Sequence, residues 1–498
     1  MTLKKKVFIG YTSQIYVAII GLVMLPVYLH YLGIESYALV GFSAMLFVWL
    51  QLLDMGLTPT LSRELSRYRA GVVSRIEALQ LLNNLEWCFG LLSGIIFVFF
   101  FSASPWIAAH WLKPEHLSVG EITLCLKIIG AMAGCRWLSG LFSAGLVGLG
   151  EQVIVGLVQI VMATIKSVGV VLVIVYLSST LEAFFIFQGC VTVFEMLWMR
   201  SLINKQLDGG RVILFPQLEV LQRIKKFAGA MAFLTMIWVV ITQIDKLLLS
   251  NILPLKEYGY FILSTSAASI ITMVAVPFNQ IVQPQLTKLR AQNKQEQLIS
   301  LYRKTTQVAC LILAVAAGTL AIYAEPLLLI WTGNVDVARH AERTLFWYAL
   351  GNGLAGILAI PFWLQFAYGN LRYHVAGNII FGVIWIPTLI ISAYYFGAIG
   401  VAKVWFFGNL IFLLCWVPYV HSRLAADVKW DWLFQDVCMV VGSVLVVLYS
   451  MSLYNLQAMS KSLVILFLVL AAMLATLAGS IAGDKIRPIV LAYRKKMR

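Results

Sequence analysis

Apolar residues form continuous stretches of about 20 residues along the whole chain, and short polar segments separate them. A helix of about 20 residues crosses ~30 Å of hydrocarbon. The stretches show no strand-like alternation, which argues against a transmembrane barrel. The pattern therefore predicts an all-α polytopic membrane protein with about fourteen transmembrane helices. The predicted spans are 8–30, 37–58, 78–102, 119–147, 152–177, 181–203, 227–251, 258–283, 306–331, 344–368, 373–395, 398–421, 433–454 and 462–482.

Composition agrees with this class. Hydrophobic residues make up 61% of the 498 residues, charged residues make up 12%, and the mean hydropathy is +0.88. Soluble domains are closer to half apolar and a quarter charged. The formal net charge of +15 is explained by basic cytoplasmic loops and does not require a nucleic-acid partner. The seven cysteines form no C-x-x-C pair, which favours packing roles.

Basic residues gather in alternate loops, such as the predicted loop 59–77, and near both ends of the chain. By the positive-inside rule, both termini are cytoplasmic. The basic segment 206–226 separates two halves that repeat weakly at a shift of 221, for example Tyr37 on Tyr258. The predicted organisation is a six-helix bundle (1–205), a cytoplasmic linker (206–226), a second six-helix bundle (227–426), and two extra helices with a basic tail (427–498).

Motifs for catalysis are absent from the sequence. It has no Walker A loop, no H-E-x-x-H zinc motif and no G-x-S-x-G nucleophile elbow. The loops between predicted spans are short and leave little room for an extramembrane active site. We therefore expect a non-enzymatic protein with no catalytic residue, metal or bound cofactor.

Cations within the spans are the first candidates for function. Arg136 and Lys166 lie near the middle of the fourth and fifth spans, and Gln159 lies seven residues before Lys166 on the same predicted helix face. Mid-membrane cations favour an anionic ligand such as a phosphate. Lys403 lies closer to a span end, where snorkelling to the interface is an alternative to binding substrate. These four residues form the predicted cationic, substrate-binding cavity.

Acidic residues within the spans are candidates for ion coupling. They are Asp54, Glu86, Glu195 and Asp245. Such acids can bind H⁺ or Na⁺ and couple an ion gradient to transport. The alternative is a purely neutralising pair with a nearby base such as Arg136 or Lys166.

Three segments carry a resemblance to a known family: LPVYLHYLGIESYALVGF at 25–42, LLDMGLTPTLSREL at 52–65 and TQIDKLLLSNILPLKEYGYF at 242–261. The chain resembles the polysaccharide (O-antigen) flippases of the multidrug/oligosaccharidyl-lipid/polysaccharide superfamily, whose fold is similar to that of multidrug and toxin extrusion transporters. The resemblance implies two six-helix bundles around a central cavity, plus two C-terminal helices. It also implies alternating-access transport of an undecaprenyl-pyrophosphate-linked oligosaccharide, an O-antigen or related repeat unit, across the bacterial inner membrane.

The resemblance further implies membrane lipids, a polysaccharide polymerase and chain-length machinery as partners, with lipopolysaccharide or another surface polysaccharide as the product. Two alternatives stay open at this point. The first is a small-molecule or drug cation antiporter of the same fold, which acids and aromatics would serve better than cations. The second is a polytopic polysaccharide polymerase or glycosyltransferase, which would need a sizeable extramembrane loop.

Overall fold

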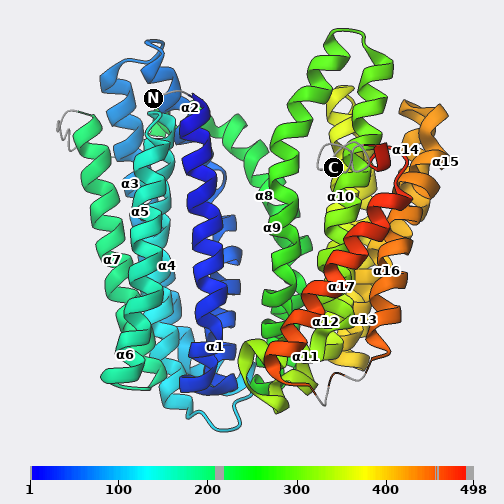
Figure 1. The fold of residues 1–498 in the computed structure, drawn as a ribbon. Coiled ribbons are helices and arrows are strands. Elements are labelled where there is room, and N and C mark those ends of the chain that lie inside the picture. The colour runs from blue at the N-terminus through cyan, green and yellow to red at the C-terminus, as the bar shows by residue number, and fades with distance from the viewer. Residues whose placement is uncertain (1–2, 208–217, 455, 457–458, 489–498) are drawn as a thin grey trace. The chain divides into compact units, whose positions relative to one another are not determined.

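The computed structural model describes residues 3–207, 218–454, 456 and 459–488 (Figure 1). These residues form helices joined by short loops and turns, with no strand among them. Eleven helices in this part of the chain are long and apolar enough to cross a membrane. The all-α, multi-pass membrane fold predicted from the hydrophobic pattern is thus confirmed.

Two of the eleven candidate spans, Thr12–Asp54 and Arg372–Leu424, have 43 and 53 residues, about twice the length that one crossing needs. Each is interrupted by a glycine outside the helical region, Gly33 with φ +80° and Gly397 with φ +57°. Residues with a Cβ are strained at such positive φ, so glycine is suited to both bends. If the two arms of each bent helix are counted as separate crossings, the number of candidate spans agrees approximately with the predicted fourteen.

The chain divides into two compact units, Met1–Gly259 and Tyr260–Arg498. The first unit includes the helix Leu218–Ile252, which begins inside the predicted linker 206–226, and residues 208–217 of that linker lie outside the described residues. The predicted division into two bundles and a C-terminal pair stays a prediction.

The first unit holds its apolar core between α2, α3, α4, α5 and α7, with large side chains such as Phe89, Trp137 and Phe142. Serine residues cap two of these helices: Ser74 and Ser118 each accept from the third residue of the helix, and the Glu at that position reaches back. The elements are α1 (Leu3–Leu50), η1 (Gln51–Asp54), α2 (Leu57–Arg69), α3 (Arg75–Trp106), η2 (Ile107–Trp111), α4 (Val119–Gly148), α5 (Gln152–Thr164), η3 (Ile165–Gly169), α6 (Val170–Tyr176), α7 (Leu181–Gln206) and α8 (Leu218–Ile252).

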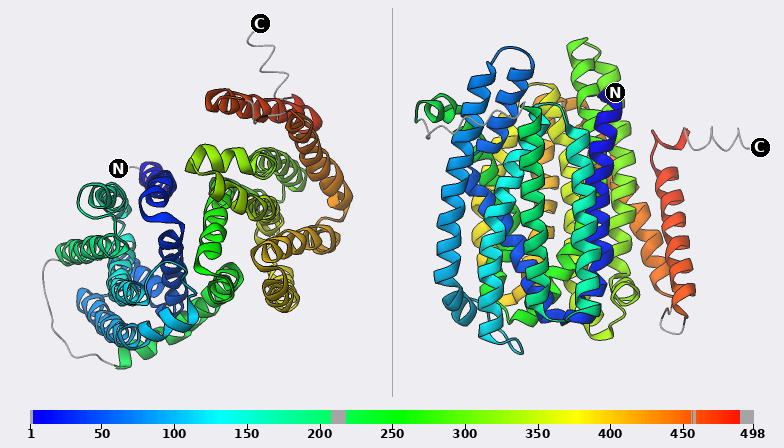
Figure 2. Two further views of the ribbon diagram at one scale, coloured as in Figure 1. Left: turned by 90° about the horizontal axis from the view of Figure 1, so that it is seen from below. Right: turned by 90° about the vertical axis from the view of Figure 1, so that its left-hand side faces the viewer.

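The second unit contains most of α9 and all later helices. Its last two long helices, α16 and α17, pack against each other and against α10 (Figure 2). The elements are α9 (Leu255–Ala291), α10 (Gln295–Ile322), α11 (Ala324–Thr332), α12 (Val335–Ala367), α13 (Arg372–Ile411), η4 (Phe412–Trp416), α14 (Val417–Leu424), η5 (Ala426–Val428), α15 (Lys429–Asp431), η6 (Trp432–Cys438), α16 (Met439–Ser452) and α17 (Lys461–Ala482).

The helix α2 was not expected. The predicted loop 59–77 instead contains most of this short helix, which buries Thr60, Leu61 and Leu65 and leaves its arginines outward. Leu61 and Leu65 are spaced four residues apart, so they share one helix face toward the core. This amphipathic helix contains many charged residues and is too short to cross a membrane, so the pattern of membrane-length apolar runs did not predict it.

A buried network of charged and polar side chains links the C-terminal helices to α10. Arg303 donates from Nε to one oxygen of Asp436 (2.7 Å) and from an NH₂ nitrogen to the other (3.1 Å). Asp436 is fully buried, and Gln307 also donates to it, at 2.6 Å. The amide of Gln307 bonds to Asp484 as well, and its oxygen accepts from the backbone N–H of Lys485. These bonds join α10, η6 and the residues after α17.

Asp484 lies beyond the membrane-spanning part of α17. Burial raises the pKa of its carboxyl group, but hydrogen bonds from Gln307 and Lys485 and the nearby Arg303 outweigh that effect, so that the pKa lies below its ordinary value. The carboxylate is therefore ionised at neutral pH, where it accepts from Gln307.

We predict that Arg303→Gln destabilises the protein by about 3 kcal/mol, because it leaves the buried charge of Asp436 without its partner. Thermal or denaturant unfolding in detergent measures the loss. The double variant with Asp436→Asn is expected to recover part of it, and Arg423→Gln, at an exposed arginine of α14, serves as the control. Equal losses in Arg303→Gln and Arg423→Gln would contradict the assigned role.

We also predict that Gly56→Ala destabilises the protein more than Gly71→Ala. Both glycines have positive φ, which costs alanine about 1–2 kcal/mol. A Cβ at Gly56 would also lie 2.4 Å from the carbonyl oxygen of Ala228 and 2.7 Å from Cβ of Met231, whereas a Cβ at Gly71 meets nothing within 4 Å. Overpacking adds about 1–3 kcal/mol. Comparing the two unfolding free energies isolates the contact that Gly56, at the start of α2, makes with α8, and equal values would refute it.

Candidate functional site

The candidate site in the first unit is organised around Lys166. This residue lies in η3, a five-residue π-helical segment between α5 and α6. Such segments interrupt an α-helix and are frequent at functional sites. The interruption changes the side-chain register after α5, so the predicted seven-residue stripe from Gln159 to Lys166 does not continue on an unbroken α-helix.

Side chains from two neighbouring helices satisfy the backbone of this π-helical segment. The amide of Gln188 on α7 donates to the carbonyl of Lys166 (3.2 Å), and the hydroxyl of Tyr28 on α1 donates to the carbonyl of Ser167 (3.3 Å). An unsatisfied backbone group in the bilayer costs several kcal/mol. These two bonds therefore stabilise the interruption and fix the position from which the Lys166 side chain extends.

Lys166 forms an ion pair with Glu195 of α7. The two side chains are about equally accessible, with 18% and 17% of their surface exposed. The pair is therefore largely, but not completely, buried. Lys166 was predicted as one possible neutralising partner for an acid within the spans, and it pairs with Glu195.

Arg136 lies at the middle of α4, as predicted, and is exposed. Its guanidinium carbon lies 4.4 Å from the ring centroid of Phe47 on α1, a cation–π contact. Glu195 interacts electrostatically with Arg136 as well as with Lys166. Arg136, Lys166 and Glu195 thus form a charged triad with two cations and one acid, which leaves one positive charge to balance.

A second ion pair shares only α7 with this site. Arg200 of α7 donates to Glu86 of α3 at 2.8 Å. Glu86 was a predicted candidate, whereas Arg200 was not, because Arg200 lies near the end of the predicted span 181–203, where basic residues are common. The predicted binding residue Gln159 is half-buried on α5.

The other two acids have local partners. Asp54 ends η1 and accepts from the backbone N–H of Thr58 (3.0 Å) and from its hydroxyl, so it satisfies one of the free N–H groups in the first turn of α2. Asp245 is buried in α8, and the ammonium of the adjacent Lys246 lies 3.2 Å from one of its oxygens. Neither belongs to the charged triad, and a coupling role for all four acids stays a prediction.

Lys403 belongs to the second unit. Its ammonium lies 5.7 Å from the ring centroid of Trp347, and its side chain lines a groove along α13. The grouping of Lys403 with Arg136, Lys166 and Gln159 in one cavity stays a prediction. Arg343 of α12 lines the same groove and was not found from the sequence, since only the folding of α12 beside α13 places it there.

Metal binding has no support among the residues that the structure describes, where no three His, Cys, Asp or Glu side chains are placed to hold a metal ion. The free cysteines are dispersed, and several are exposed.

The fold and this charged interior are typical of a polytopic transport protein. The sequence matches the family described as "Polysaccharide biosynthesis protein" over residues 3–290. More than half of the chain is matched, and the chain belongs to this family, as its motifs suggested. A search of curated proteins finds no match.

Several solved structures share this fold. The structure titled "Lipid II flippase MurJ, inward closed conformation" superposes with a TM-score of 0.74 at 14% identity, covering 99% of this chain and 100% of that one. An inward-facing multidrug resistance MATE transporter gives a TM-score of 0.63 at 15% identity, covering 81% and 94%. A Vibrio cholerae MATE transporter, VcmN, gives 0.55 at 12% identity, covering 86% and 98%. At these identities the likeness concerns the fold.

Proposed function

We propose that this protein carries an undecaprenyl-pyrophosphate-linked oligosaccharide from the inner to the outer leaflet of a bacterial inner membrane by alternating access. The substrate is an O-antigen or related polysaccharide repeat unit. The observation that carries the proposal is the triad of Arg136, Lys166 and Glu195, which has a net positive charge inside a membrane-embedded unit. Membership in a polysaccharide biosynthesis family and the fold shared with a lipid II flippase support it.

The triad supplies a mechanism for binding the pyrophosphate. A pyrophosphate group entering the site competes with Glu195 for Lys166 and also attracts Arg136. Charge-assisted hydrogen bonds to phosphate are about twice as strong as neutral ones. Their strength increases further where water is scarce. The sugar follows the pyrophosphate into polar surroundings, while the polyprenyl chain stays in an apolar environment, so only the head group must be sheltered from hydrocarbon.

Glu195 is our preferred residue for coupling to an ion gradient. When the pyrophosphate engages Lys166, the carboxylate of Glu195 loses its direct partner. An uncompensated charge in low-dielectric surroundings is costly, and binding of H⁺ or Na⁺ removes that cost. Asp54, Glu86 and Asp245 are secondary candidates, because each already has a local hydrogen-bond or ion-pair partner. We propose no other cofactor.

Both termini lie in the cytoplasm in this proposal, and a polysaccharide polymerase with its chain-length machinery uses the product outside. A drug cation antiporter is less well supported, because the triad repels cationic compounds. An enzymatic polymerase or glycosyltransferase would need a large extramembrane domain, whereas the connections between described helices are short.

We predict that deletion of the gene causes lipid-linked repeat units to accumulate on the cytoplasmic side. Lys166→Met and Arg136→Met should each reduce rescue of the deletion by about tenfold or more, because a hydrogen bond to a charged group is worth about 1.5–3 kcal/mol. Rescue is measured as repeat units accessible to an added hydrolase in spheroplasts.

Lys127→Met is the matched control, since Lys127 is also on α4 but stacks on Phe101, with its ammonium 4.4 Å from the ring centroid. Equal amounts of protein in the membrane must be verified for each variant. If surface polysaccharide is unaffected by the deletion while sensitivity to cationic drugs rises, the flippase proposal fails and the antiporter takes its place.

A further inference from the structure

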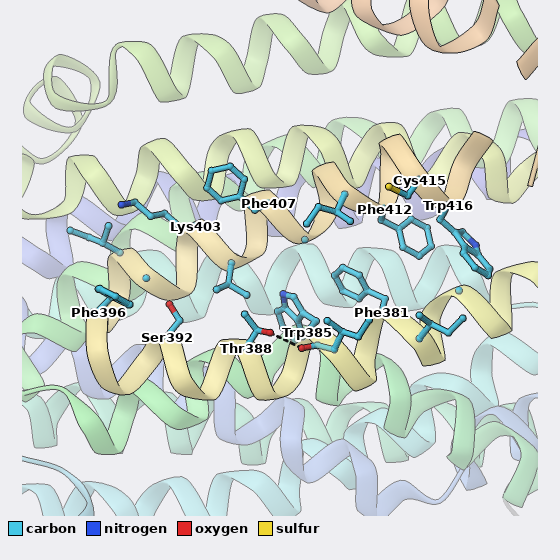
Figure 3. Close-up of a pocket in the computed structure, with 18 of the residues that line it drawn as sticks. Phe381, Trp385, Thr388, Ser392, Phe396, Lys403, Phe407, Phe412, Cys415 and Trp416 are labelled. Atoms are coloured by element: carbon cyan, nitrogen blue, oxygen red, sulfur yellow. Dashed lines mark hydrogen bonds between the residues drawn. The ribbon is translucent and has the colours of Figure 1, made fainter. Parts of the chain in front are cut away.

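A long groove runs between the two arms of α13. The helix folds back at Gly397, so that residues 372–396 and 398–411 form a hairpin, which η4 continues. The groove has a volume of about 860 Å³ (Figure 3). It lies entirely within the second unit and is separate from the charged triad of the first.

The walls of the groove are largely aromatic and aliphatic. Trp385 stacks on Phe381, with ring centroids 5.7 Å apart, and Phe381 meets Phe412 edge to face at 5.7 Å. Phe407 and Trp416 extend the same lining along the second arm (Figure 3). Such a surface suits a hydrocarbon chain and offers few partners to a polar solute.

The end of the groove near the Gly397 bend is polar and positively charged. Lys403 lies there, together with the hydroxyl of Ser392 (Figure 3). Arg343 of α12 also lines the groove, and it lies about one helical turn before Trp347, whose ring centroid is 5.7 Å from the Lys403 ammonium. Lys403 and Arg343 are both exposed, and neither forms an ion pair with any acid in the described part of the chain. Two cations at one end of an apolar groove are complementary to an amphiphile with an anionic head.

The length of the groove distinguishes between lipids. From Lys403 to Trp416 the second arm rises about 20 Å, at about 1.5 Å per residue. One leaflet contributes about half of the ~30 Å hydrocarbon core. An acyl chain whose head group lies at Lys403 would therefore end before the groove does, whereas a longer isoprenoid chain can fill it.

We propose that this groove binds the lipid carrier itself, with its phosphate at Lys403 and Arg343 and its polyprenyl chain along the aromatic walls. The inference rests on the proposed function, in which the oligosaccharide is attached to such a carrier. With both termini in the cytoplasm, the Gly397 bend lies on the outer side. The groove then holds the carrier after its head group has reached the outer leaflet, and it is a release site distinct from the triad.

The test uses the purified full-length protein in phosphatidylcholine nanodiscs and undecaprenyl phosphate carrying a photoreactive diazirine on its chain. Crosslinks mapped by mass spectrometry should fall on the two arms of α13. Unlabelled undecaprenyl phosphate should compete, whereas undecaprenol, phosphatidylglycerol and inorganic phosphate should compete at least about tenfold less well, because each lacks either the charge or the chain.

Variants test the two ends of the groove separately. Thr388→Phe fills the groove and should abolish labelling, whereas Val383→Phe, on the same arm but outside the groove and 69% exposed, should not. Lys403→Gln and Arg343→Gln should each weaken labelling about tenfold. Arg339→Gln, one turn away on α12 and outside the groove lining, should leave it unchanged.

Crosslinks that map away from α13, or labelling that survives Thr388→Phe, would overturn the proposal. Effective competition by phosphatidylglycerol would overturn it too, since the groove would then be a general lipid site. The experiments distinguish failure of the groove proposal from failure of the flippase proposal. If the groove variants lose labelling in vitro but the deletion strain accumulates no lipid-linked repeat units, the flippase proposal fails and the groove stands. If the strain accumulates them but the groove stays unlabelled, only the groove proposal fails.

Discussion

The cost of an ionised side chain away from water is the constraint on which this structure depends. Glu195, Glu86 and Asp436 each lie within a membrane-length helix, and each has a basic partner from another helix. Every such pair therefore also links two helices. Removing one partner leaves a charge that low-dielectric surroundings cannot stabilise, so these pairs determine which helices stay together. The triad departs from this neutrality because it has two cations and one acid, and we propose that the anionic head group of the substrate binds there.

The same scarcity of water governs the backbone. Helices satisfy their own peptide groups, and each interruption needs partners from elsewhere. At η3, Gln188 and Tyr28 provide them. These bonds give the Lys166 side chain a defined position. A fixed position supports the proposal that Lys166 binds substrate. The two proposals assign these sites to different stages of transport. The triad binds the pyrophosphate of the substrate, and the α13 groove afterwards binds the carrier, with its phosphate at Lys403 and Arg343 and its chain along the aromatic walls.

Much of the fold followed from the sequence. Membrane-length apolar runs identify spans without any knowledge of packing, since crossing the bilayer requires length and hydrophobicity alone. The motifs around Leu25, Asp54 and Asp245 identified the family. The short helix α2 was missed because a charged amphipathic helix has no such signature, and only its contacts with the core reveal which face is apolar.

The sequence by itself determined that the protein crosses a membrane many times, that Arg136 and Lys166 lie at mid-span, and that acids accompany them. Only the tertiary structure decided the pairing: Glu195 with Lys166, Glu86 with Arg200, and Arg136 against Phe47. It also placed Arg343 and Lys403 along one groove. Spacing along a helix defines which residues share a face, but partners on different helices are set by how those helices pack, which a hydrophobic pattern does not encode.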